Sequence, residues 1–233
     1  MPLFEPRPVP ENDELMGTDA ATRALSVAAV ENDFVAKVYE NIAWAYDFTF
    51  GPTLHPGRLQ AIQRMSIRPG DRVLEVGVGT GINAPLYPSD CLVTGIDLSD
   101  SMLEKARDRV ARKGLRNIRL LEMDAADLKF ADHSFDIVYA PYLISVVPDP
   151  VAVVREMRRV CRPGGRIILL NHFRSPNPVL AWIERSISPL TIHIGFKSDL
   201  DLPAFLTQAD LKPVSIERIN LPRIWSLVTC IKD

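Results

Sequence analysis

Three closely spaced glycines directly after an apolar run are the strongest sign of chemistry in this chain. The run Val73–Val76 leads into Gly77, Gly79 and Gly81, which alternate with other residues. Glycine lets the backbone turn sharply and approach a ligand with no Cβ in the way. In an open sheet of strands and helices, ligands bind where the strands end. The glycine run therefore predicts a ligand-binding turn.

Acidic residues end the next two apolar runs and add hydrogen-bond acceptors near this turn. Asp97 closes the second run, where its carboxylate could accept hydrogen bonds from a ribose diol. Asp124 follows the third run and could accept from an adenine amine, with the Ala125 backbone beside it. Ile82 stands where the dinucleotide fingerprint G-x-G-x-x-G needs its last glycine. These residues predict a nucleoside cofactor and disfavour a dehydrogenase.

Apolar runs of β type alternate with helical segments through most of the chain. The predicted strands are Arg72–Val76, Leu92–Ile96, Ile118–Leu121, Ile137–Ala140, Arg166–Leu170, Val214–Asn220 and Ile224–Ile231. Helices are clearest at Ser99–Arg112 and Val151–Cys161, and another is expected directly after the glycine run. The last two strands are close enough to pair antiparallel. The pattern predicts an α/β fold: a Rossmann-like seven-stranded, mostly parallel sheet with the last strand antiparallel.

The chain before the first strand has a different character. Residues 1–17 are rich in proline and acids and are expected to form a flexible tail. The sequence of residues 18–66 predicts N-terminal helices, which are expected to form a lid or to contact a membrane. Gly51-Pro52 and His55-Pro56-Gly57 are expected to break the chain before a short helix over Arg58–Met65.

The rest of the chain, residues 67–233, is expected to form one domain with one insertion. Residues 174–199 hold many large apolar side chains between the fifth strand and the next helix. A plain crossover would be shorter. The segment therefore predicts a lid over the carboxyl edge of the sheet.

Composition excludes several classes of protein. The 233 residues are 47% hydrophobic and 24% charged, with a net charge of −2, which is ordinary for a globular protein and carries no basic excess for nucleic acid. Three scattered cysteines disfavour a disulfide scaffold and a cysteine-rich zinc site. The N-terminus lacks the features of a signal peptide, and the longest uncharged apolar stretch, Ile137–Pro148, is too short to span a bilayer.

At five successive places the sequence resembles class I S-adenosylmethionine-dependent methyltransferases. The matching stretches are LEVGVGTG, GIDLS with Met102, MDAADL, FDIVYAPYLISVV and RPGGRIILLNH. The resemblance implies S-adenosyl-L-methionine as cofactor, S-adenosyl-L-homocysteine as product, and no metal.

The family pattern also implies which residues hold the cofactor. It assigns the amino-acid moiety to Glu75, Gly77, Gly79 and Gly81, and the ribose to Asp97. It places the adenine among Leu98, Met102, Asp124 and Ala125. Ala140, at the active-site edge of the fourth strand, completes the predicted set.

A second resemblance concerns the entrance to the site. The run from Tyr46 to Gly51 is similar to the Y-D-x-x-F-G motif of quinone C-methyltransferases and of soluble bacterial phosphatidylethanolamine N-methyltransferases. The continuation His55-Pro56-Gly57-Arg58, the strand end Leu170–Phe173 and the apolar insertion fit the second group better.

Five residues are candidates for the acceptor side: Tyr39, Tyr46, Tyr142, His172 and His193. Tyr39 and Tyr46 are two helical turns apart, so they face the same way and could hydrogen-bond a phosphate. A primary amine with a pKa of about 10.4 must lose a proton before it can accept a methyl group. Histidine, tyrosine or a water held by them could take that proton.

The leading prediction is an enzyme that N-methylates phosphatidylethanolamine, and its mono- and dimethyl products, toward phosphatidylcholine. It is expected to be cytoplasmic and peripheral on the inner face of the cell membrane. Its expected partners are a phospholipid substrate and the membrane surface, with no nucleic acid and no obligate protein partner. The alternatives are C-methylation of a quinone precursor and a methyltransferase-like binding module without activity.

Overall fold

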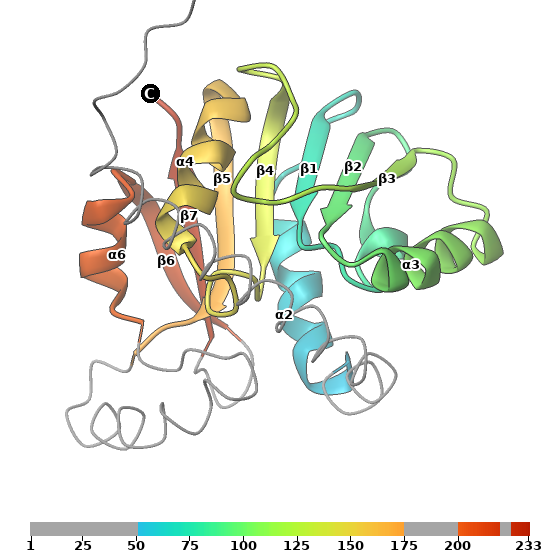
Figure 1. The fold of residues 1–233 in the computed structure, drawn as a ribbon, viewed down its shortest axis with the longest axis horizontal. Coiled ribbons are helices and arrows are strands. Elements are labelled where there is room, and N and C mark those ends of the chain that lie inside the picture. The colour runs from blue at the N-terminus through green and yellow to red at the C-terminus, as the bar shows by residue number, and fades with distance from the viewer. Residues whose placement is uncertain (1–50, 175–199, 220–224) are drawn as a thin grey trace, which may run out of the picture.

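The computed structural model describes residues 51–174, 200–219 and 225–233, which form one sheet with helices on both faces (Figure 1). The strands are β1 (Arg72–Val76), β2 (Leu92–Asp97), β3 (Ile118–Glu122), β4 (Phe135–Pro141), β5 (Cys161–His172), β6 (Pro213–Ile219) and β7 (Trp225–Ile231). Their order is β3-β2-β1-β4-β5-β7-β6. Strand β7 runs antiparallel to both its neighbours, and the other pairs are parallel. The predicted fold class is confirmed.

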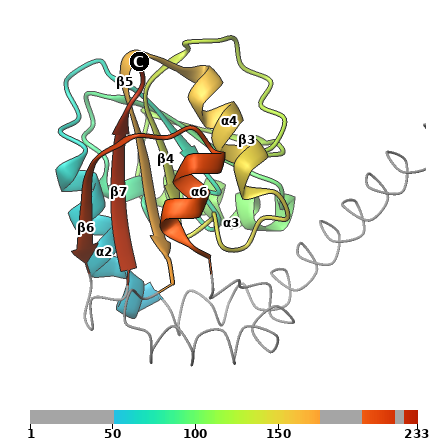
Figure 2. The ribbon, with the colours of Figure 1, turned by 90° about the vertical axis from the view of Figure 1, so that its left-hand side faces the viewer.

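Helices α4 (Pro150–Val160) and α6 (Leu202–Gln208) cover one face of the sheet (Figure 2). Their apolar residues join a buried cluster with inward-facing strand residues, including Leu74, Val138, Ile167 and Val228. Asp149 caps α4 by accepting from the backbone of Val151 and Ala152, so the chain turns into the helix right after the β4 loop. The packing of α4 and α6 against the strands therefore supports the sheet next to the carboxyl ends of its strands.

Helix α2 (Gly51–Arg64) covers the opposite face (Figure 2). Its buried residues Leu54, Ala61 and Ile62 pack in a second cluster with residues of β1, β4, β5 and β7. The two breaks predicted at Gly51-Pro52 and His55-Pro56-Gly57 are wrong, because the helix runs through both. Proline costs no hydrogen bond in a first turn, and at Pro56 the loss of one bond is offset by burial of the apolar face.

The helix predicted directly after the glycine run is also wrong. That segment forms a single 3-10 turn, η1 (Ala84–Leu86). Pro85 is the second residue of the turn, and Tyr87, which follows the turn, is extended (φ −73°, ψ 142°). A residue before proline avoids the α conformation, so Pro88 ends the turn. The chain therefore goes from β1 to β2 without a full helix.

Helix α3 (Asp100–Arg112) matches its prediction closely. Ser99 is its N-cap, with its side-chain oxygen accepting from the Met102 backbone at 3.4 Å. The helix contacts β2 and β3, and its residues Met102, Leu103 and Ala106 are buried. The cap matters for the site because it starts the helix directly after Asp97.

Candidate cofactor-binding site

Two adjoining cavities lie at the carboxyl ends of β1, β2 and β4. The smaller has a volume of about 140 Å³ and the larger about 390 Å³. They share four lining residues: Gly77, Asp97, Leu98 and Leu143. From β1 the chain passes to β2 on one side and later to β4 on the other, so this is the switch point where open α/β sheets bind ligands.

The three glycines of the turn differ in what surrounds them. All have positive φ, between 55° and 74°. A Cβ at Gly81 would stand 3.0 Å from the Ala106 Cβ and 3.1 Å from its Cα, so Gly81 allows close packing on α3. A Cβ at Gly77 would meet the side chain of Leu143 at 2.8 Å. A Cβ at Gly79 would meet no protein atom within 4 Å, and Gly79 lines the smaller cavity. The open space at Gly79 is therefore ligand space.

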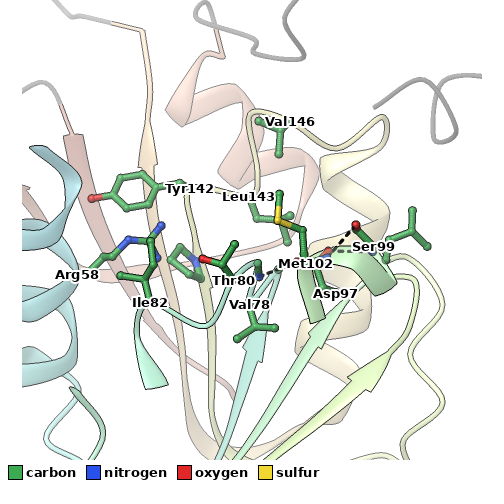
Figure 3. Close-up of a pocket in the computed structure, with 14 residues that line it drawn as sticks. Arg58, Val78, Thr80, Ile82, Asp97, Ser99, Met102, Tyr142, Leu143 and Val146 are labelled. Carbon is green, nitrogen blue, oxygen red and sulfur yellow. Dashed lines mark hydrogen bonds between the residues drawn. The ribbon is translucent and has the colours of Figure 1, made fainter. Parts of the chain in front are cut away.

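Asp97 connects the glycine turn to the end of β2. Its Oδ2 accepts from the Gly79 backbone N at 2.7 Å, and its Oδ1 accepts from the Ser99 backbone N at 3.0 Å (Figure 3). Each carboxylate oxygen has a further lone pair for a ligand. Burial raises the pKa of Asp97, and the backbone donors oppose that shift. The carboxylate thus both holds the turn and faces the cavities, as a ribose acceptor must.

The larger cavity is lined mostly by apolar residues, together with the acidic residues Asp97, Asp124 and Asp149. Its apolar side chains include Ile96, Leu143, Val147 and Val153. Asp124 and Ala125 also line this cavity, and Asp124 Oδ1 accepts from the Ala126 backbone N at 2.8 Å. A flat aromatic base with an exocyclic amine suits such a wall.

The other end of the smaller cavity is formed by α2 and the β4 loop. Arg58 of α2 and Tyr142 both line the cavity, and the Arg58 guanidinium carbon lies 4.9 Å from the Tyr142 ring centroid (Figure 3). Arg58 Nη1 donates to Asn83 Oδ1 at 3.3 Å. A buried cation thus stands at the end of the cavity away from Asp97.

Glu75 supports the turn from beneath and lines neither cavity. It is 1% exposed, and its two oxygens accept from Asn83 Nδ2 and Tyr87 Oη, each at 2.6 Å. Burial raises the pKa of Glu75 from 4.5 to about 7, although the hydrogen bond from Tyr87 and the charge of Arg58 oppose this shift. Glu75 is therefore linked to the smaller cavity indirectly, through Asn83, whose side-chain oxygen accepts from the lining residue Arg58.

Tyr142 combines an unusual backbone with a hydroxyl directed at α2. Its φ is 58°, which is rare for a residue with a side chain. Its hydroxyl donates to the Leu54 backbone oxygen at 3.1 Å, and its ring meets Trp225 edge-on at 4.8 Å between centroids. Tyr142 therefore ties the exit of β4 to α2 and β7, while its ring lines the cavity.

The remaining predicted residues fall into three groups. Leu98 and Met102 line the smaller cavity. Ala140 and His172 are buried and do not line either cavity; His172 stacks edge-on against Trp225 with 5.8 Å between ring centroids. Tyr39, Tyr46 and His193 lie outside the described residues.

Several lining residues were not predicted from the sequence. The clearest is Arg58, which was noted only as part of the His55-Pro56-Gly57-Arg58 resemblance. Leu143 and Val146 follow β4 and also line the smaller cavity. A helical period that puts Arg58 with Leu54, Ala61 and Ile62 could have indicated a buried arginine, had the helix itself been predicted.

These features define an open α/β sheet that binds a nucleoside cofactor at its switch point. Comparison with known proteins is consistent with this: residues 74–169 match the family described as a methyltransferase domain. A phosphatidylethanolamine N-methyltransferase of Cereibacter sphaeroides is 44% identical over 172 residues, covering 73% of this chain and 83% of that protein. The ubiquinone/menaquinone biosynthesis C-methyltransferase UbiE of Ectopseudomonas mendocina is 35% identical over 164 residues, covering 66% and 64%.

A solved structure shows the same fold. The phosphoethanolamine N-methyltransferase 2 of Haemonchus contortus, in complex with S-adenosyl-L-methionine, superimposes with a TM-score of 0.68 at 18% identity, covering 87% of this chain and 60% of that one. The chain belongs to the S-adenosylmethionine-dependent methyltransferases. Its cofactor is S-adenosyl-L-methionine, which supplies a methyl group on a positively charged sulfur.

The described residues fit this cofactor. The open space at Gly79 gives room beside the turn, and Asp97 presents a carboxylate for two ribose hydroxyls. The apolar cavity beside Asp124 suits the adenine. The protein's own contribution is to bind and orient the cofactor, since correct alignment of two reactants lowers a barrier by up to roughly 7–11 kcal/mol.

Proposed function

We propose that this enzyme methylates the amine of phosphatidylethanolamine, and of its mono- and dimethyl products, toward phosphatidylcholine. One observation carries the proposal: the 44% identity to a phosphatidylethanolamine N-methyltransferase extends over 83% of that protein. The 172 aligned residues include more than the cofactor motifs, because the methyltransferase domain match spans the shorter range 74–169.

An amine acceptor needs a group that takes up a proton. An amine with a pKa of about 10.4 is almost fully protonated at pH 7. Forming its neutral, nucleophilic state at that pH costs roughly 4.6 kcal/mol. We place this role among Tyr39, Tyr46, His172 and His193. Tyr142 is a further candidate on the acceptor side, because its ring lines the smaller cavity, although its hydroxyl donates to the Leu54 backbone oxygen. Replacing Tyr46 with Phe should therefore lower turnover without lowering the melting temperature.

We also place the reaction at the membrane surface on the cytoplasmic side. From residue 174 to residue 197 the insertion carries Arg174, Arg185 and Lys197 against Glu184, together with many large apolar residues, and Asp199 follows. Such a segment suits weak, reversible binding to a lipid surface. No helix within the described ranges has the length and apolarity needed to cross a membrane. Deletion of residues 1–30 should reduce flotation with liposomes more than it reduces cofactor affinity.

The runner-up is C-methylation of a quinone precursor, which the 35% identity to UbiE favours. Mass spectrometry of lipids and quinones from a host expressing the protein separates the two. New mono-, di- or trimethylated headgroups support phospholipid methylation, and a methylated quinone with unchanged phospholipids contradicts it. Expression of the Asp97→Ala variant gives the matched background, because it lacks the ribose acceptor.

A further inference from the structure

Helix α2 places a buried cation at the end of the smaller cavity. Arg58 is 7% exposed and lines the cavity with the glycine turn. Within residues 51–174, 200–219 and 225–233 it forms no ion pair, and its Nη1 donates only to the neutral amide oxygen of Asn83. The ring of Tyr142 stabilises the charge in part. The charge of Arg58 is also felt by the Glu75 carboxyl, whose pKa it lowers, but the two side chains form no direct ion pair. A buried charge that forms no ion pair is costly, so an anion in contact with Arg58 would be strongly favoured.

One donor of this guanidinium is left over. Arg58 Nε is buried and has no hydrogen-bond partner among the described residues. A buried donor without an acceptor is destabilising, and nearly all such donors in native proteins are satisfied by protein, water or ligand. Arg58 therefore lines the cavity with a guanidinium group whose hydrogen-bonding capacity the described residues do not use up.

The position of Arg58 indicates which acceptor is missing. In Figure 3, Arg58 lies at one end of the labelled residues and Asp97 and Ser99 at the other, with Thr80 and Ile82 between them. A cofactor whose ribose binds Asp97 and whose chain follows the glycine turn directs its far end toward Arg58. In S-adenosylmethionine that far end carries an α-carboxylate, and guanidinium groups bind carboxylates with two parallel hydrogen bonds.

We propose that Arg58 binds the α-carboxylate of S-adenosylmethionine, and so makes the site selective for this cofactor over its decarboxylated form. The proposal gives α2, which lies outside the matched methyltransferase domain, a direct part in cofactor recognition. It does not depend on which acceptor is methylated, so a failure of the phospholipid proposal would leave it untouched.

Calorimetric titration of the full chain with S-adenosylmethionine and with decarboxylated S-adenosylmethionine tests the proposal. The wild-type protein should prefer the carboxylated cofactor by roughly ten- to a hundredfold, the size expected for hydrogen bonds to a charged group. Arg58→Met should lose this preference because its affinity for S-adenosylmethionine falls. Its affinity for the decarboxylated form should stay or rise, since a repelling positive charge is gone.

Two further variants control for folding and for charge. Arg64→Met removes an arginine from the same helix that forms a surface ion pair with Glu217, and it should keep the wild-type preference. Arg58→Lys keeps the charge without the fork-shaped geometry and should show an intermediate preference. If Arg58→Met melts below the assay temperature, Arg58→Lys tests the proposal instead, through the ratio of its affinities for the two cofactors.

Two results would overturn the proposal. If Arg58→Met loses affinity for both cofactors equally, Arg58 supports the glycine turn and does not bind the carboxylate. A wild-type preference in Arg58→Met, with loss of glycerophosphoethanolamine binding to protein saturated with S-adenosylhomocysteine, would move the anion site to the acceptor's phosphate.

Discussion

The two ends of the cofactor cleft are built in different ways. At the Asp97 end, one carboxylate accepts from Ser99, two residues on, and from Gly79, 18 residues back. At the α2 end, Arg58 reaches Asn83 across 25 residues, and Tyr142 reaches Leu54 across 88. The first end depends on short motifs that carry their own geometry. The second exists only because α2 is held against the sheet.

At the Asp97 end of the cleft, Asp97→Ala should cause a large loss of cofactor affinity. The ribose would lose a charged acceptor for two hydroxyls, which corresponds to about 3 kcal/mol or more and to at least roughly a hundredfold weaker cofactor binding by calorimetry. Asp100→Ala is the matched control, because Asp100 is exposed on α3 and pairs only with Arg107 at the surface. Unchanged affinity in folded Asp97→Ala would remove this residue from the site.

The glycine turn offers a way to separate ligand space from packing. Gly79→Val and Gly81→Val share a positive φ, which costs a residue with a side chain about 1–3 kcal/mol. Gly79→Val should abolish cofactor binding with the smaller loss of stability, because its side chain enters the cavity. Gly81→Val should lose more stability, because its side chain meets Ala106. Calorimetry and melting curves on both variants check this, and the reverse order would mean that the turn is placed incorrectly.

The raised pKa of Glu75, which lies beneath the glycine turn, predicts that the stability of the protein depends on pH. Its pKa is about 7 in the folded protein and near 4.5 when unfolded, so the folded state binds the proton more tightly between these values. The free energy of unfolding should therefore fall as pH rises from about 4.5 to 7, by as much as about 3 kcal/mol. Glu75→Gln should lack this component.

Melting temperatures of wild type and Glu75→Gln at pH 5, 6, 7 and 8 measure the difference. The wild-type protein should lose stability relative to the variant along this series. Parallel curves for the two proteins would show that the Glu75 carboxyl titrates at its ordinary pKa.

The smallest effect should come from Tyr142→Phe at the α2 end. The change removes one hydrogen bond to Leu54, worth about 0.5–1.5 kcal/mol, and keeps the ring against Trp225. The melting temperature should fall by a few degrees and cofactor affinity should change little. A large fall in turnover at an unchanged melting temperature would instead assign the hydroxyl to the acceptor. Tyr87→Phe is a useful comparison, because Tyr87 donates to Glu75 and lines neither cavity.

Some features were predictable because they depend on residues that are close in the chain. The strands followed from apolar runs bounded by turn residues, and α3 from the helical segment Ser99–Arg112. Prolines misled the prediction in α2, where Pro56 signals a break that tertiary burial overrides. After the glycine run the opposite happened: Pro88 stopped a helix that the usual strand–turn–helix pattern predicts.

The sequence by itself determined the fold class, the glycine turn and the carboxylate at Asp97, because each rests on local patterns of apolar, glycine and acidic residues. Only the tertiary structure decided that Glu75 lies beneath the turn, that the Tyr142 hydroxyl binds Leu54, and that Arg58 enters the cavity. These three depend on where α2 and η1 lie against the sheet. That placement comes from burial of apolar surface, which is non-directional and therefore leaves no short motif in the chain.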